Sequence, residues 1–162
     1  MAGQGHYTHD ELTRAFEAYN AARDRASETG DWSLWAAVFH EDARYIEHAY
    51  GEMHGREAIR EWITGVMAPF PRMTFPQDWS VIDVPNGAVV FQCRNQLPPP
   101  YDSDGRPFGF PTWSRIVYAG GGLWASEEDV YNPARDAGRA IRAWRAAGGR
   151  FESPEVVKME SR

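Results

Sequence analysis

Residues 30–63 read GDWSLWAAVFHEDARYIEHAYGEMHGREAIREWI, and the spacing of their apolar side chains changes twice. Helical spacing over residues 30–42 gives way to alternation over residues 42–51, and helical spacing returns over residues 54–67. The pattern therefore predicts a short helix, a strand that ends in a turn at Gly51, and a longer helix.

One face of the predicted strand combines an aromatic side chain with a carboxylate. Alternation places Tyr45 and Glu47 together and puts His48 on the opposite face. A carboxylate that faces an aromatic pocket is poorly solvated, which raises its pKa toward the range useful for a base. We therefore expect Glu47 to take a proton from a carbon beside a carbonyl, or to activate a water. His48 is a candidate proton relay, although it points away from Glu47.

Glu47 also has a structural interpretation, in which it lies at the rim of the sheet and forms an ion pair. The arginines that would serve as its partner are Arg44, Arg56 and Arg94.

The remaining elements predict one α+β domain over residues 1–162, with its core at about residues 8–147. Helices come first and a run of strands follows, an order that favours α+β over a parallel α/β sheet. We expect a helix over 8–29, strands over 79–85, 87–97, 108–119 and 122–131, and a last helix over 132–149.

Composition and charge exclude several classes of protein. The 162 residues carry 23 acids against 17 bases, a net charge of −6, without the basic cluster that nucleic-acid binding needs. No apolar run approaches membrane length, and the first residues do not resemble a signal peptide. Cys93 is the only cysteine, which rules out an internal disulfide. We expect a soluble, cytoplasmic protein.

Aromatic residues make up 14% of the chain, which suits an apolar pocket for a flat organic molecule as well as a large core. Asn95 is placed to offer its amide to a ligand carbonyl, and Tyr131 is a further ligand-contacting residue. The predicted pocket wall consists of Trp35, Phe39, Trp62, Met67, Phe110 and Trp113, each of which ordinary core packing would also explain.

Three consecutive acids, residues 127–129, occupy a predicted strand, where acids are disfavoured. Alternation puts Glu127 and Asp129 on one face with Tyr131, and Glu128 on the other. At least one acid must face inward or into a subunit contact, and an inward Asp129 would be a second carboxylate near Glu47. For two of the three acids we favour ion pairs with the arginines of neighbouring strands.

Three motifs carry a resemblance to a known superfamily: Gly-Asp at 30–31, Glu-Asp-Ala at 41–43 and Gly-Arg-Glu-Ala-Ile at 55–59. In this order they resemble the SnoaL-like polyketide cyclases and ketosteroid isomerases of the nuclear transport factor 2-like superfamily, over residues 8–147. The resemblance implies a cone-shaped α+β barrel, in which a curved, mostly antiparallel sheet wraps around the N-terminal helices. That fold serves isomerases, cyclases, dehydratases, epoxide hydrolases and non-catalytic binders.

The resemblance also suggests roles for single residues. Glu47 falls where the isomerases place a catalytic aspartate. Tyr19 is a candidate to stabilise an enolate oxygen. It lies one helical turn before the family's usual tyrosine position, which ungapped counting gives to Arg23. Tyr45 and Tyr131 are alternative donors.

These observations favour a cofactor-independent acid–base enzyme of the isomerase, cyclase, lyase or dehydratase type. Its partner would be a small apolar molecule, namely an aromatic or polycyclic carbonyl or hydroxyl compound. The three histidines at the centre of the chain lack the spacing of a metal site. The alternatives are a non-catalytic binder and an epoxide hydrolase, for which Arg94 and Asp129 supply only part of the usual Asp-Arg-Asp set. An outward sheet face with Trp113, Val117 and Val90 predicts a homodimer.

Overall fold

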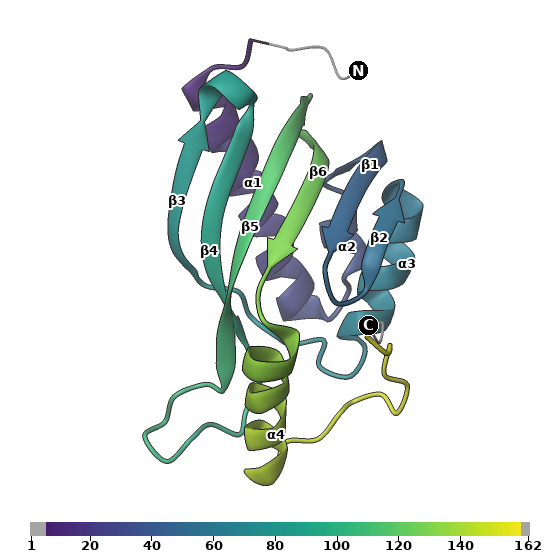
Figure 1. Cartoon of the computed structure of the whole chain (residues 1–162), viewed down its shortest axis with the longest axis vertical. Coiled ribbons are helices and arrows are strands. Elements are labelled where there is room, and N and C mark those ends of the chain that lie inside the picture. The colour runs from purple at the N-terminus through teal and green to yellow at the C-terminus, as the bar shows by residue number, and fades with distance from the viewer. Residues whose placement is uncertain (1–5, 160–162) are drawn as a thin grey trace.

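The computed structural model describes residues 6–159, as helices packed against one curved six-stranded sheet (Figure 1). The strand order is β2-β1-β6-β5-β4-β3, and every neighbouring pair is antiparallel except β1 and β6. The α+β prediction is confirmed. The strands are β1 (Phe39–Glu47), β2 (Gly51–His54), β3 (Gln77–Asp83), β4 (Ala88–Gln96), β5 (Gly109–Gly120) and β6 (Leu123–Val130). The helices are α1 (His9–Thr29), α2 (Ser33–Ala36), α3 (Arg56–Met67) and α4 (Gly138–Ala146).

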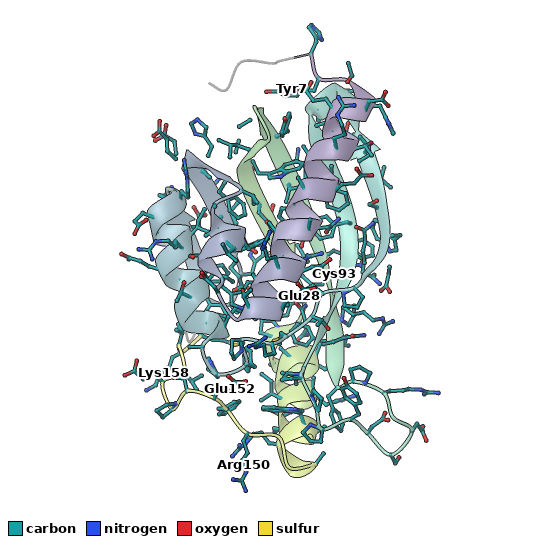
Figure 2. All side chains as sticks on the ribbon, turned by 180° about the vertical axis from the view of Figure 1, so that it is seen from behind. Tyr7, Glu28, Cys93, Arg150, Glu152 and Lys158 are labelled. Carbon is teal, nitrogen blue, oxygen red and sulfur yellow. The ribbon has the colours of Figure 1, made fainter. Side chains whose placement is uncertain are left out.

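Helix α1 begins and ends where its capping residues predict. The Thr8 hydroxyl accepts the Glu11 backbone N–H at 3.1 Å, and Gly30 adopts the left-handed φ of 77° that ends the helix. Its buried stripe includes Leu12, Phe16 and Tyr19 and lies against the sheet, as the view from behind shows (Figure 2). No helix in the described part of the chain is long and apolar enough to cross a membrane.

The segment from Gly30 to His54 departs from prediction in two places. The predicted helix over 30–42 is a single turn, α2, because residues from Phe39 onward pair with β6 and adopt the extended conformation. The predicted turn at Gly51 is present, with a φ of 100°, but it leads into the short strand β2, which sequence analysis missed. Four residues are too few for alternation to separate a strand from the start of the following helix.

Two of the remaining connections contain a short helical turn. A short 3₁₀ helix, Val84–Asn86, joins β3 to β4 and ends at Gly87 in the left-handed region. The predicted last helix starts with a π-helical turn, Pro133–Ala137, and continues as α4. Beyond α4 the chain runs back toward the end of α3 (Figure 1).

Strand register brings the acidic residues together. In the parallel pair of β1 and β6, Tyr45 lies beside Glu127 and Glu47 beside Asp129. In the antiparallel pair of β5 and β6, Ser114 lies beside Asp129. Register partners project from the same face of a sheet, so these side chains all face the helices.

Candidate functional site

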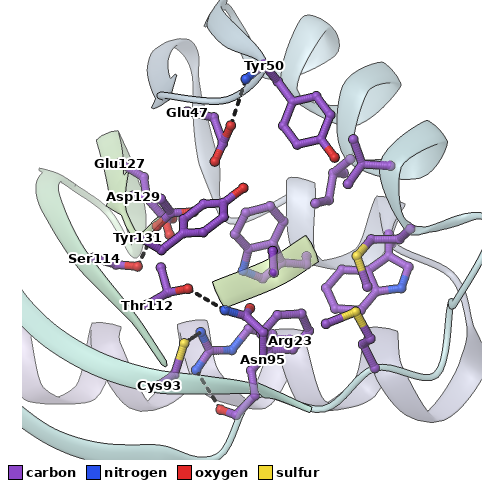
Figure 3. A pocket seen from close by; sticks show the side chains of 18 of the residues that line it. Arg23, Glu47, Tyr50, Cys93, Asn95, Thr112, Ser114, Glu127, Asp129 and Tyr131 are labelled. Atoms are coloured by element: carbon purple, nitrogen blue, oxygen red, sulfur yellow. Dashed lines mark hydrogen bonds between the residues drawn. The ribbon is translucent and has the colours of Figure 1, made fainter. Parts of the chain in front are cut away.

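A cavity of about 120 Å³ lies between the concave face of the sheet and the helices α1, α3 and α4, and Met159 near the end of the described chain also lines it. Figure 3 shows its polar side chains from close by. Its wall is mainly aromatic and aliphatic, with a few polar side chains. The wall includes Tyr19, Arg23, Trp35, Tyr45, Glu47, Tyr50, Trp62, Met67, Phe75, Cys93, Asn95, Phe110, Thr112, Ser114, Glu127, Asp129 and Tyr131.

Glu47 is held at the cavity by its own backbone neighbours. Its side chain is 3% exposed, and its Oε2 accepts the backbone N–H groups of Ala49 at 2.7 Å and Tyr50 at 2.8 Å. The turn after β1 supplies both donors, because the chain reverses there toward β2. The other oxygen, Oε1, is buried and has no hydrogen-bond partner among residues 6–159.

Burial raises the pKa of Glu47 above its ordinary value. The Tyr131 hydroxyl and the N–H groups of Ala49 and Tyr50 oppose that rise, whereas the nearby charge of Asp129 adds to it. Tyr131 approaches the carboxylate without reaching a geometry that satisfies Oε1. Glu47 is therefore a carboxylate of raised basicity with one oxygen unengaged.

Glu127 and Asp129 form a second carboxylate group deeper in the fold. Tyr19 donates its hydroxyl to Glu127, at 2.9 Å from Oε1 and 3.0 Å from Oε2. Tyr45 donates to Asp129 Oδ2 at 2.5 Å, and Ser114 donates to Asp129 Oδ1. All the hydroxyl donors thus come from elements that surround β6.

The surroundings of these two carboxyl groups favour one shared proton over two negative charges. Burial, and then the negative charge of Asp129, raise the pKa of Glu127 well above its usual range. Burial also raises the pKa of Asp129, but the hydroxyls of Ser114 and Tyr45 oppose the rise. Because adjacent buried carboxylates resist ionising together, we place the proton on Glu127 and the charge on Asp129.

Arg23 is a buried cation in the same cavity. It is 5% exposed, and its guanidinium lies over the rings of Tyr19, Phe75 and Phe91, 5.3–5.5 Å from their centroids. Nη1 donates to Cys93 Sγ at 3.7 Å, and Nη2 donates to the Asn20 side chain at 2.9 Å and to the Phe75 carbonyl at 3.2 Å. Nε is buried and, within the described chain, has no acceptor.

Ten of the thirteen predicted site residues line this cavity. They are Tyr19, Tyr45, Glu47 and Asp129 of the predicted catalytic set, and Trp35, Trp62, Met67, Asn95, Phe110 and Tyr131 of the predicted ligand-binding set. Asn95 donates its amide to Thr112 Oγ1. Their placement in the cavity leaves their roles as predictions.

Three predicted site residues lie elsewhere. Phe39 is fully buried in the core, where its ring packs edge to face against those of Trp35 and Tyr45, and it does not line the cavity. Trp113 is 54% exposed on the outer face of the sheet, since the inward residues of β5 are Thr112 and Ser114.

His48 is the third residue outside the cavity. It is exposed, as alternation predicted, and its Nε2 lies 2.9 Å from Glu128 Oε1. We predicted that two of the three acids at residues 127–129 form ion pairs with arginines of neighbouring strands. This prediction was wrong, because Glu127 and Asp129 both face inward and accept hydrogen bonds from hydroxyl groups. Arg94 instead lies outside, 3.4 Å from Asp78.

Sequence analysis gave no role to Arg23 or Ser114. Two signals for Arg23 were available: it lies four residues after Tyr19 on the same face of α1, and ungapped counting gave it the family's usual tyrosine position. Ser114 shares the even-numbered inward face of β5 with Thr112. Within residues 6–159, no group of three His, Cys, Asp or Glu side chains is placed to hold a metal ion.

A family model described as the SnoaL-like domain matches residues 10–127. This chain belongs to the SnoaL-like domain family. The predicted superfamily is thereby confirmed, and the match spans most of the sheet and every helix that packs on it except α4. No curated protein matches this SnoaL-like domain.

Solved structures share the fold of the SnoaL-like domain at low sequence identity. One of them is a hypothetical protein with a ketosteroid isomerase-like fold from Catenulispora acidiphila, in complex with trimethylamine. It is 19% identical with a TM-score of 0.59, and the match covers 83% of this chain and 95% of that one. An epoxide hydrolase from M. tuberculosis, related to the LEH type, is 16% identical with a TM-score of 0.62, covering 85% and 94%. TerC, co-crystallised with polyporic acid, is 16% identical with a TM-score of 0.57, covering 82% and 96%. At these identities the likeness shows the fold alone.

Proposed function

We propose that this SnoaL-like domain is a cofactor-independent enzyme that transfers protons on a small aromatic carbonyl or hydroxyl compound. The observation that carries the proposal is Glu47 Oε1, a buried carboxylate oxygen without a partner at an aromatic cavity. A general base needs raised basicity and an oxygen that is not already bonded, and the raised pKa and unpartnered Oε1 of Glu47 support this role.

In this proposal the two oxygens of Glu47 have different tasks. The backbone N–H groups of Ala49 and Tyr50 fix Oε2 and orient the carboxylate. Oε1 removes a proton from a carbon beside the substrate carbonyl and later returns it. Isomerisation, aldol-type cyclisation or cleavage, and dehydration all begin with this step.

The size and lining of the cavity favour a small, flat substrate. Its volume, about 120 Å³, is comparable to the cavity of about 150 Å³ that holds a benzene molecule in an engineered protein. The indoles of Trp35 and Trp62 form part of the wall and suit stacking against a ring. A compound with one ring and a carbonyl or hydroxyl substituent therefore fits better than a polycyclic one.

A non-catalytic binder of the same fold is the second candidate function. It is favoured by the Glu127–Asp129 pair, whose oxygens are engaged by the hydroxyls of Tyr19, Tyr45 and Ser114. Bound trimethylamine and polyporic acid in structures of similar fold also agree with small-molecule binding. Epoxide hydrolysis with Arg94 is less well supported, because Arg94 lies outside the cavity beside Asp78.

A comparison of two variants separates enzyme from binder. Glu47→Gln keeps the shape of the side chain and removes the base, whereas Glu128→Gln alters an exposed glutamate on the opposite face of β6 as a control. Ligand binding is followed by the fluorescence of the cavity tryptophans, and turnover is screened over small aryl ketones, hydroxyketones and epoxides. A ligand that binds both variants equally but is never turned over by the wild type would favour the binder.

We also propose that the chain forms a homodimer through an outer patch on the sheet. The patch consists of Trp79, Val81, Trp113 and Val130, all exposed. Trp79 and Trp113 contact each other edge to face, with ring centroids 5.3 Å apart. Exposed apolar surface of this kind on a sheet is commonly covered by a partner.

A further inference from the structure

We propose that Arg23 stabilises a negatively charged oxygen of the ligand, an enolate or a phenolate, in the cavity. For an enolate, this proposal rests on the proposed function. The preference of the cavity for an anionic oxygen, however, is measurable without turnover. Arg23 would thereby take the oxyanion-stabilising role for which Tyr19, Tyr45 and Tyr131 were the sequence-based candidates.

The charge of Arg23 is buried without a close counter-ion. A guanidinium stays protonated in proteins, and its acceptors here are neutral: an amide of Asn20, a backbone carbonyl of Phe75 and the Cys93 sulfur. Burial raises the pKa of Cys93 to about 11, which keeps the thiol uncharged at neutral pH. Among residues 6–159, no carboxylate lies within 4.0 Å of the Arg23 guanidinium.

The unpaired Nε adds a second, independent observation. A buried donor on a charged group is costly to leave without an acceptor, so such a donor in a folded protein calls for an explanation. The rings of Tyr19, Phe75 and Phe91 fix the guanidinium plane, and its two terminal nitrogens are already bonded. A guanidinium held in this way keeps its positive charge in place as negative charge develops on a ligand oxygen.

The other donors of the cavity are less suited to this role. The hydroxyls of Tyr19 and Tyr45 donate to Glu127 and Asp129, and the amide of Asn95 donates to Thr112. The indole N–H groups of Trp35 and Trp62 have no acceptor in the described structure, but they are neutral. Arg23 is the only basic side chain among the described residues of the wall.

The acidic groups of the cavity direct the ligand. The carboxyl groups of Glu47 and Asp129 lie on β1 and β6, whereas Arg23 comes from α1 and lies beside Cys93 and Asn95 of β4 (Figure 3). A ligand oxygen that gains charge is therefore drawn toward Arg23 and repelled from the carboxylates. This arrangement leaves the acidic carbon of the ligand facing Glu47.

The test uses 4-nitrophenol, whose phenolate and phenol forms have different absorption spectra. The wild-type protein is titrated with the dye at a pH where the free dye is about half ionised, and the spectrum gives the ionised fraction of the bound dye. We expect the phenolate to bind more tightly than the phenol by about 10- to 100-fold, the range of a charge-assisted hydrogen bond. Preferential binding of the neutral phenol would overturn the proposal, and this measurement requires no variant.

Variants then assign the preference to one residue. Arg23→Met keeps the length and apolar stem of the side chain and should abolish the preference for phenolate. Arg23→Lys keeps the charge and should retain a reduced preference, which guards against a folding defect in the Met variant. The control, Arg25→Met, changes an exposed arginine on the same helix and should behave as the wild type. Phenolate preference that survives in a folded Arg23→Met variant would contradict the proposal.

Glu47→Gln separates this inference from the proposed function. The variant should keep its preference for phenolate, because Arg23 is unchanged. Loss of turnover in Glu47→Gln together with no phenolate preference in the wild type would refute the role of Arg23 and leave the role of Glu47 standing. Phenolate preference with undiminished turnover in Glu47→Gln would refute Glu47 as the base and leave Arg23 as the anion-binding residue.

Discussion

Glu47 and Asp129 are register partners on the parallel strands β1 and β6, yet their carboxyl groups are bonded in different ways. Both oxygens of Asp129 accept hydroxyl groups, from Tyr45 and Ser114. Glu47 has one oxygen on two backbone N–H groups and the other without a partner in the described structure. This difference supports the proposal that Glu47, and not Asp129, transfers the proton.

The rate of the proposed reaction should rise with pH through the raised pKa of Glu47. The base acts in its ionised form, so activity is lost as the carboxylate becomes protonated. We expect the lower limb of kcat/KM against pH to lie above the ordinary glutamate value of about 4.3. A limb at or below that value would contradict the basicity that we assign to Glu47.

The folded protein should become less stable as pH rises, and Glu127 should be one cause. The pKa of Glu127 is raised by burial, so the folded state binds its proton more tightly than the unfolded state does. The resulting stability is fully present below the unfolded pKa and is lost as pH rises through the folded one.

Glu127→Gln tests this dependence, because it keeps an acceptor for Tyr19 and cannot ionise. Urea denaturation at several pH values should show a smaller decline in the free energy of unfolding than the wild type shows. The residual decline would come from Asp129 and Glu47, whose pKa values are also raised. Glu128→Gln, on the exposed face, should leave the decline unchanged, and an equal effect of both variants would count against the buried proton.

Substitution of a core aromatic residue should mainly reduce stability, whereas substitution of a cavity aromatic residue should mainly reduce ligand affinity. Phe39→Ala removes a fully buried ring outside the cavity and should lower the free energy of unfolding by about 3–5 kcal/mol, with ligand affinity retained in the folded fraction. Phe110→Ala removes a partly buried ring at the cavity wall and should reduce affinity more than stability. Denaturant titration and tryptophan fluorescence measure the two quantities, and the reverse pattern would show that Phe39 contacts the ligand.

The outer patch should determine the oligomeric state. Trp113→Glu places a charge at the centre of the exposed apolar residues of β3, β5 and β6 and should convert a dimer to a monomer in sedimentation velocity. Tyr101→Glu changes an exposed aromatic residue on the loop between β4 and β5 and serves as the control. A wild-type chain that sediments as a monomer at micromolar concentration would contradict the proposed interface.

The fold was predictable from the sequence because its elements have distinct periods and end at capping residues. Thr8 and Gly30 delimit α1, and alternation correctly grouped Tyr45 with Glu47 and Glu127 with Asp129, although it left open which acids face inward. Alternation along β5 also places Trp113 on the face of the sheet opposite to Ser114, because their numbers differ by one. The placement of Trp113 in the pocket wall neglected that parity.

The rest of the site depends on contacts that local patterns do not encode. Alternation gives the face on which Phe39 lies, but not its distance along β1 from the cavity. The partners of Glu127 and Asp129 lie on α1, β1 and β5, so their hydroxyl bonds follow from sheet order and register. Arg23 was overlooked because arginine is rarely buried, although its helical position agrees with the buried stripe.

Whether the protein acts in the cytoplasm stays a prediction from the sequence.

The most direct test of the central claim is kcat/KM of Glu47→Gln relative to wild type, on the best substrate that the screen of small aromatic compounds yields. If Glu47 is the general base, the ratio should fall by about 10²- to 10⁴-fold, while the affinity for a non-reacting ligand and the thermal midpoint remain close to wild type. Turnover within a few-fold of wild type in a folded Glu47→Gln protein would contradict the assignment of Glu47 as the base.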